Sequence, residues 1–307
     1  MAPLPDAWSK SSLGTLLEGC SWQWALEKVY GQEGGGTPAT VLGTAYHAGV
    51  EWWCRSRLIE QRDRVAMFAD DGGKAAMFAV AMEALDREVE QLDDEQWALH
   101  GTDYATLVEE LAAALEHWWS TPIRDGQPGA GMSIRERIMR WRIIAVEPAF
   151  NEQPTEGLTG VRGFIDLLVW DPDDAVYRVV DHKSAGSFGR WAHDGAGHEI
   201  EAGVYVVGAE IASHLPAHGP VVMEWQITRK KLSAHARFEG VRVIEFEVQD
   251  VHRLWLEDRI KLANRIVADD LFETNPGWNL CSAKWCPHFR GCQVDGDLHP
   301  RQLMAQG

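Results

Sequence analysis

The sequence predicts a mixed α/β protein with a helical N-terminal half and a small cysteine-rich segment at its C-terminal end. Up to about residue 140, apolar residues recur at the spacing of amphipathic helices. After that point the apolar stretches are short, rich in β-branched residues and bounded by turn residues. Three of the five cysteines fall between Cys281 and Cys292. With 307 residues, 45% of them hydrophobic, the chain can bury a substantial core.

Four helices are expected in the N-terminal half. The first contains Leu13, Leu16, Leu17, Cys20 and Trp24 on one face and ends near Gly31. The others are expected over 41–60, 73–93 and 102–120, and the second carries His47 and Cys54 on one face.

Strands dominate the second half. The segments 141–150, 158–171 and 175–183 read as the first of them, followed by a helix over 197–214. Two further strands over 221–230 and 242–249 precede a helix over 250–270. We expect three regions in one compact unit: 1–140 mainly helical, 141–270 the α/β core, and 271–307 a cysteine-containing cap.

Charge argues against a broadly basic nucleic-acid surface. The net charge is −17, and most of it lies between residues 60 and 117. Four arginines between Ser133 and Arg142 reverse the trend, so this segment is a candidate strand-binding patch, with an ordinary solvated surface as the alternative. The neighbouring Trp118 and Trp119 are expected in the core.

A predicted hairpin brings charged residues together in the second half. If Asp171–Asp174 forms a symmetric turn, Asp181 lies opposite Phe164, and Asp166, Asp181 and Lys183 share one face. The two carboxylates then lie on a diagonal, roughly 7–8 Å apart at Cα, and both can reach one divalent cation. Such a cation and a neighbouring ammonium suit phosphodiester hydrolysis. The alternative is a salt bridge on an exposed sheet face.

The pattern Gly163-x-x-Asp166 followed by Asp181-His182-Lys183 resembles the PD-(D/E)xK nuclease superfamily, and within it the RecB-like branch. The resemblance implies a restriction-endonuclease-like mixed β-sheet core flanked by helices. It also implies a Mg²⁺ or Mn²⁺ site in which Asp166, Asp181 and the backbone carbonyl of His182 are ligands.

Two helical motifs of that branch also have counterparts. The stretch 43–53, "GTAYHAGVEWW", is similar to its helix with a metal-binding histidine, which makes His47 a ligand. The Gln-x-x-x-Tyr motif corresponds to 201–205, where Glu201 replaces the glutamine and Tyr205 is retained. With Asp166, Asp181 and Lys183, these two residues complete the expected catalytic set. Glu147 is expected to support the site or the fold.

The cysteines match a subgroup of that branch. In iron–sulfur RecB-like nucleases, which include CRISPR-associated and phage exonucleases, one cysteine precedes the nuclease motifs and three follow them. Cys20, Cys281, Cys286 and Cys292 have this order, so the resemblance implies a 4Fe–4S cluster. Four thiolates suit zinc as well, and the spacing does not decide between the two. Cys54 reads as a small buried residue.

The expected function is therefore a metal-dependent DNA exonuclease acting on single strands or DNA ends, in recombination, repair or phage DNA processing. One alternative is a catalytically silent DNA-binding or scaffold protein. Another is a zinc-stabilised nuclease subunit that works only with a partner helicase. The Gly-x-x-x-x-Gly-Lys phosphate loop of a helicase is missing from the sequence, which fits an exonuclease that works as a self-contained chain. A secretory signal and a long apolar run are both missing from the sequence, so we expect a cytoplasmic protein that does not cross a membrane.

Overall fold

The computed structural model describes residues 4–32, 34–68, 71–151, 159–189, 199–211, 215, 221–231, 240–278, 280–294 and 297. It confirms the mixed α/β fold. Five strands form the central sheet, in the order β2 (Arg142–Val146), β5 (Leu167–Asp171), β6 (Val176–Ala185), β7 (Val221–Arg229) and β8 (Val241–Glu247). The β6–β7 pair is parallel and the other three pairs are antiparallel. Helix α8 (Glu199–Ile211) lies between β6 and β7 in the chain, as a parallel pair requires.

A smaller sheet lies beside the first. Its order is β1 (Ala7–Trp8), β4 (Gly160–Phe164) and β3 (Ala149–Asn151), with β1 parallel and β3 antiparallel to β4. Because β1 comes from the start of the chain, this sheet fixes the N-terminal segment next to the core.

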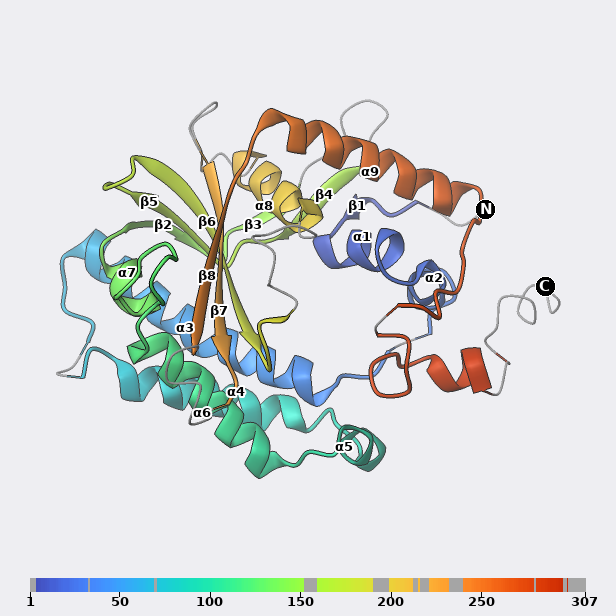
Figure 1. Ribbon diagram of the computed structural model, residues 1–307, viewed down its shortest axis with the longest axis horizontal. Helices are drawn as coiled ribbons and strands as arrows, with labels where there is room; N and C mark the ends of the chain where they lie inside the picture. Colours follow the sequence, from blue (N-terminus) through green and yellow to red (C-terminus); the bar gives the residue numbers. More distant parts are fainter. Residues whose placement is uncertain are drawn as a thin grey trace.

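Helices cover the two faces of the central sheet (Figure 1). On one side α8 packs with α1 (Lys10–Leu17) and α9 (Asp250–Ala268), and α2 (Ser21–Lys28) packs on α1. The other side carries α3 (Pro38–Asp63), α4 (Lys74–Val89), α5 (Asp94–His100), α6 (Tyr104–Ser120) and α7 (Ile134–Met139). Each layer has its own apolar core. Val179 belongs to the first core and its neighbour Val180 to the second.

The first predicted helix is divided in two. Helix α1 ends at Leu17 and α2 begins at Ser21, so the prediction of one continuous helix through Cys20 was wrong. Gly19 lies in the break, and the close packing there requires a glycine, because a Cβ at this position would lie 2.9 Å from both the Thr15 carbonyl oxygen and the Trp278 ring. Cys20 is thereby placed at the start of α2, facing the C-terminal segment.

The hairpin register also differs from the prediction. Leu167 pairs with Val180, so the strands meet two residues away from the expected register. The turn extends to Ala175, whose φ of 53° is left-handed, and the strand is interrupted before Leu167, so Gly160–Phe164 joins the smaller sheet instead. Because the shift is even, the side chains keep the predicted faces.

Alternation along β6 sends successive side chains into different layers. The side chains of Asp181 and Lys183 reach residues of α1 and α8. His182, between them, lies against Trp118 of α6 at 6.4 Å between ring centroids, and is 2% exposed. The prediction that Trp118 belongs to the core is confirmed, since it is fully buried.

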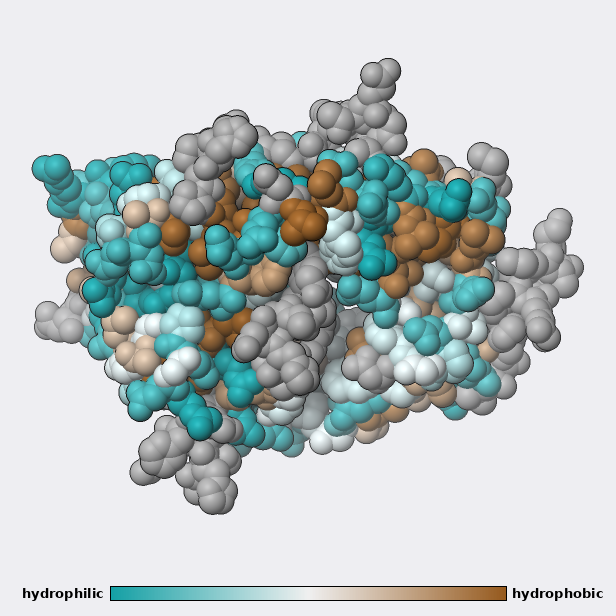
Figure 2. All heavy atoms as spheres, turned by 45° about the horizontal axis from the view of Figure 1, so that its top comes forward, coloured by the Kyte–Doolittle hydropathy of each residue, from teal (hydrophilic) through white to brown (hydrophobic). Residues whose placement is uncertain are grey.

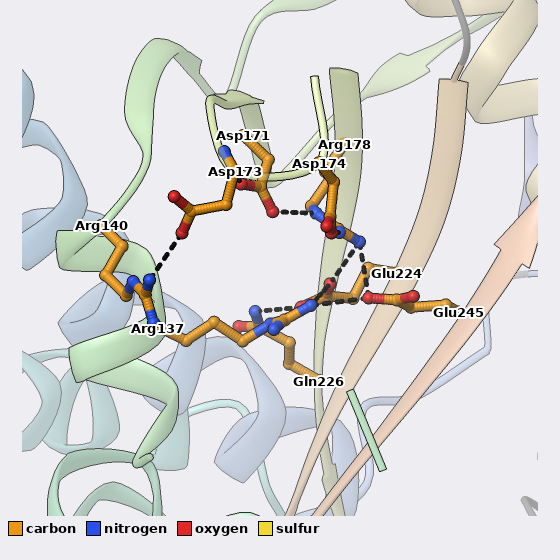
Figure 3. A network of polar contacts seen from close by, with 9 residues as sticks. All are labelled: Arg137, Arg140, Asp171, Asp173, Asp174, Arg178, Glu224, Gln226 and Glu245. Carbon is orange, nitrogen blue, oxygen red and sulfur yellow. Dashed lines mark hydrogen bonds and ion pairs between the residues drawn. The ribbon is translucent and has the colours of Figure 1, made fainter. Parts of the chain in front are cut away.

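A buried ion-pair network crosses the sheet at the α7 side (Figure 3). Arg178 of β6 binds Asp171 at 2.9 Å, Glu224 of β7 at 3.2 Å and Glu245 of β8 at 2.5 Å. Arg137 of α7 joins it with Nη2 2.9 Å from Glu224 Oε2. Both guanidinium groups are charge partners of the fully buried Glu224 carboxylate, and with Asp171 of β5 the network ties four strands and a helix together.

This network corrects the strand-binding patch. Arg137 is 7% exposed and engaged in the network, and Arg140 pairs on the surface with Asp173. The Arg135 guanidinium lies over the Trp119 ring, 4.5 Å from its centroid. Arg142 is exposed and has no charge partner among the residues that the structure describes. The structure therefore removes Arg137 from the patch, and strand binding by the other three arginines stays a prediction.

Hydrophilic side chains cover most of the left part of the face in Figure 2, and apolar ones gather toward the upper right, on the side where α9 runs in Figure 1. Val251, Leu254 and Leu262 of α9 are among the exposed apolar residues. No helix among the described residues combines the length and apolar character needed to cross a membrane.

Replacing Arg178 with methionine should lower the free energy of unfolding by about 3–5 kcal/mol, because it leaves the buried Glu224 with one charge partner fewer. The matched change Arg140→Met, at an exposed pair, should cost about 0–1 kcal/mol. Urea unfolding measures both. Equal losses would contradict a stabilising role for the network.

His182 should make stability fall in acid. Burial, followed by the charge of His47, lowers the pKa of His182 to about 3, from 6.5 for an exposed imidazole. The unfolded chain therefore takes up a proton below pH 6.5 that the folded chain does not, and the stabilisation present above pH 6.5 is lost progressively toward pH 3. In EDTA, the free energy of unfolding of the wild-type protein should fall between pH 8 and pH 5 by about 2 kcal/mol more than that of His182→Leu. If the free energy of unfolding depended on pH in the same way in both proteins, His182 could be protonated in the folded state.

Candidate nuclease site

The predicted catalytic residues converge where the two helical layers meet the central sheet. Asp166 precedes β5, Asp181 and Lys183 lie on β6, and Glu201 and Tyr205 lie one turn apart on α8. The structure brings the whole predicted catalytic set together, and His47 of α3 approaches it from the opposite layer.

His47 and Asp166 form one end of the site. Nδ1 of His47 lies 3.4 Å from Oδ2 of Asp166, and the two side chains are 32% and 15% exposed. The backbone N–H of His182 donates a hydrogen bond to the same Asp166 oxygen at 2.8 Å, which fixes this carboxylate against β6. The position of Asp166 therefore depends on β6 as well as on the segment that leads into β5.

Asp181, Lys183 and Glu201 form the other end. Nζ of Lys183 lies 2.5 Å from Oδ2 of Asp181 and 3.1 Å from Oε1 of Glu201. The carboxylates are almost buried, with side-chain exposures of 2% and 10%. The replacement of glutamine by glutamate at position 201 thus places a second carboxylate on the lysine.

A second lysine, Lys10 of α1, completes the site and was missed from the sequence. Its Nζ contacts Glu201 through a short hydrogen bond, donates to the Tyr205 hydroxyl at 3.0 Å and lies 3.7 Å from Oδ1 of Asp181. No local pattern links residue 10 to a motif so far along the chain. The available signal was Glu201 itself, since an added carboxylate in a lysine-containing site calls for another cation.

Charge coupling shifts the pKa values of these groups. Burial alone would lower the pKa of Lys10 and of Lys183, but the carboxylates of Asp181 and Glu201 outweigh it and hold both above the ordinary lysine value. Burial raises the pKa of Asp181, and the two lysines oppose that rise. Burial and then Asp181 raise the pKa of Tyr205, so its hydroxyl stays protonated.

Two glutamates flank the His47 end. Burial, and then the charges of Glu51 and Asp166, raise the pKa of Glu147. Its backbone is left-handed, with φ of 47°, and its N–H donates to the Asp166 carbonyl oxygen at 3.1 Å. This backbone contact holds the segment that carries Asp166, and the supporting role of the Glu147 side chain stays a prediction.

The donor set suits a hard divalent cation. His47, Asp166 and Asp181 offer one imidazole and two carboxylates that are close enough to influence one another. Among the described residues, no group of three or more His, Cys, Asp or Glu side chains has the geometry of a metal site. In the arrangement described here, the ammonium groups of Lys10 and Lys183 are the counter-ions of Asp181.

The four predicted cysteine ligands lie around one small cavity. Cys20, Cys281, Cys286 and Cys292 line it together with Trp22, Leu26, Trp278 and Phe289. Burial, and then mainly the neighbouring cysteines, raise the pKa of Cys286 to about 11, and Cys281 and Cys292 shift in the same direction. Thiols that raise one another's pKa are a donor set that a cation or cluster would stabilise as thiolates. Cys54 lies in the other core and is 1% exposed, so its assignment as a small core residue is confirmed.

Hydrogen bonds from both backbone and side chains join the two chain segments that line this cavity. The Trp22 N–H donates to the Glu273 carbonyl oxygen at 3.0 Å, and the Glu273 N–H donates to Ser21 Oγ at 2.7 Å. The Asn275 amide donates to the Gly19 carbonyl oxygen at 2.8 Å. These contacts dock the segment before Cys281 onto the turn that carries Cys20.

Of the comparisons with known proteins, a match to a family model assigns this chain to a family. No curated protein matches the sequence at a significant level. A crystal structure of a "Putative exonuclease" from Eubacterium rectale aligns with a TM-score of 0.47 and 10% sequence identity, covering 94% of this chain and 89% of that chain. A family model described as the PD-(D/E)XK nuclease superfamily matches residues 7–293. The match covers nearly the whole sequence, and the chain therefore belongs to the PD-(D/E)XK nuclease superfamily, whose members use divalent metals such as Mg²⁺ or Mn²⁺.

Proposed function

We propose that this protein is a Mg²⁺- or Mn²⁺-dependent DNA exonuclease that hydrolyses phosphodiester bonds on single strands or DNA ends. The observation that carries the proposal is the convergence of Asp166, Asp181 and Lys183 with His47 at one site, within a chain of the nuclease superfamily. Processing of DNA ends in recombination, repair or phage DNA metabolism is the setting that suits this activity.

His47, Asp166 and Asp181 are the residues that would hold the cation, with the backbone carbonyl of His182 as a further ligand. A bound divalent cation would polarise the scissile phosphate and lower the pKa of a coordinated water. Lys183 is placed by Asp181 and Glu201, so its ammonium can orient the attacking water and offset negative charge on the phosphorus oxygens. The protonated Tyr205 hydroxyl is a hydrogen-bond donor for a phosphate oxygen.

Cys20, Cys281, Cys286 and Cys292 are proposed to bind a 4Fe–4S cluster, with zinc as the alternative. The shared cavity of the four cysteines and the raised pKa values of Cys281, Cys286 and Cys292 support a common ligand. Soft thiolate donors suit both choices. Because the cysteines come from the two ends of the described chain, a bound group would cross-link α2 to the C-terminal segment.

A catalytically silent DNA-binding or scaffold protein is less consistent with these residues. A protein that does not cut has no need to keep two lysines and three carboxylates packed in one partly buried site, which costs desolvation free energy. A zinc-stabilised subunit of a helicase-dependent nuclease would use the same residues, and the cleavage assay below separates it by the requirement for a partner.

Replacing Lys183 with alanine should reduce Mn²⁺-dependent cleavage of a fluorescent single-stranded oligonucleotide by about a hundredfold or more, because the positioned ammonium is lost. Asp166→Asn and Asp181→Asn should have the same effect, and EDTA should stop the wild-type protein. Lys261→Ala, at an exposed ion pair on α9, is the matched control and should cut normally. A circular single strand should resist cleavage. Wild-type rates in Lys183→Ala would exclude a catalytic role for this residue.

Replacing Cys20 with serine should abolish bound iron and the brown colour of anaerobically purified protein and lower its melting temperature. A cross-link between residues so far apart in the sequence could contribute on the order of 5 kcal/mol. Cys54→Ser is the control and should keep iron and colour. A metal analysis that finds about one zinc per chain and neither iron nor sulfide would assign zinc to the site in place of the cluster. Full colour in Cys20→Ser would remove Cys20 from the ligand set.

A further inference from the structure

Four charged side chains alternate in sign at the lysine end of the site. Glu201 contacts Lys10 and Lys183, and Asp181 in turn lies within 3.7 Å of Lys10 and 2.5 Å of Lys183. The two ammonium groups have similar side-chain exposures, 28% for Lys10 and 24% for Lys183. Neither lysine can therefore be removed without changing which carboxylate the other one faces.

We propose that Lys10 is a positioning residue of the nuclease site: it neutralises Glu201 so that Lys183 remains on Asp181 and faces the reacting phosphate. This inference rests on the proposed nuclease function. Lys10 and Glu201 then act as one ion pair. This pair takes the place of the neutral glutamine that the Gln-x-x-x-Tyr motif has at position 201.

The distances support this division of roles. Lys10 makes its closest contact with Glu201 and a longer one with Asp181, whereas Lys183 makes its closest contact with Asp181 and a longer one with Glu201. Without Lys10, the Glu201 carboxylate would face Lys183 as its neighbouring ammonium group. In this partly desolvated setting solvent screens charges weakly, so Lys183 would be drawn toward α8 and away from Asp181.

Tyr205 supplies a second anchor for Lys10. The Lys10 ammonium donates to the Tyr205 hydroxyl at 3.0 Å and lies 4.9 Å from the centroid of its ring. Two residues one turn apart on α8 thus hold the same ammonium, which fixes its position more firmly than one surface ion pair could.

A pair that acts as a unit should show opposite single effects and a rescued double variant. Lys10→Met should lower the cleavage rate by about tenfold or more and should bind Mn²⁺ more tightly, since an extra unneutralised carboxylate then lies beside Asp181. Glu201→Gln should bind Mn²⁺ more weakly, because Lys10 loses its partner. The double variant Lys10→Met/Glu201→Gln restores the net charge and should regain most of the lost cleavage rate. It should also bind Mn²⁺ with the wild-type midpoint, which is the Mn²⁺ concentration at half-saturation.

Cleavage of the labelled oligonucleotide, the electron paramagnetic resonance signal of free Mn²⁺ and thermal unfolding in EDTA are measured on all four proteins. Lys261→Met is the matched control and should change none of the three. Lys10→Arg keeps the charge and should keep the Mn²⁺ midpoint, which guards against a Lys10→Met variant that does not fold.

Additive single effects in both rate and Mn²⁺ midpoint, with no rescue in the double variant, would overturn the proposal. So would variants that alter thermal unfolding alone, because that result assigns the pair a purely structural role. If the wild-type protein binds Mn²⁺ but cuts no DNA, the proposed function fails, and the Mn²⁺ midpoints still decide the role of Lys10. Equal midpoints in Lys10→Met and the wild-type protein would exclude it.

Discussion

The alternation of side chains along β6 is the constraint on which the rest of the structure depends. Asp181 and Lys183 belong to the site because their neighbours Arg178 and His182 are buried in the opposite layer. A slip of one residue would exchange these two sets and would place charges in an apolar core. The ion pairs of Arg178 with strands on both sides make such a slip costly, so the buried network of Figure 3 fixes the register of the strand that carries the site.

The site and the cysteine cavity are joined through the first two helices. Lys10 lies at the start of α1 and Cys20 at the start of α2, with the tight turn at Gly19 between them. Hydrogen bonds from Glu273 and Asn275 hold that turn against the C-terminal segment. A group bound by the cysteines would therefore restrain α1, the helix that carries Lys10. Loss of that group would affect the site through a change in α1 rather than in the sheet.

The sequence predicted those parts of the site that depend on local periodicity. Asp166, Asp181 and Lys183 were placed on one face even though the hairpin register was two residues off, because an even shift leaves the faces unchanged. Lys10 could not be predicted in this way, since its role arises from packing of α1 on α8. The inclusion of Arg137 in the strand-binding patch failed for a related reason: its segment looked exposed, but the partners that bury Arg137 lie on distant strands.

Charge in the site explains how a chain with a net charge of −17 can act on an anionic polymer. The carboxylates of Asp166, Asp181 and Glu201 outnumber the ammonium groups of Lys10 and Lys183. Glu51 and Glu147 at the His47 end add two more carboxylates, with Arg55 as their partner, so without a cation the site is negative and repels a phosphodiester. A divalent cation would neutralise this excess. On the proposed function, the cation therefore binds before the DNA. The two lysines keep the excess negative charge small enough for a single cation to neutralise it, which the same site with one lysine would not achieve.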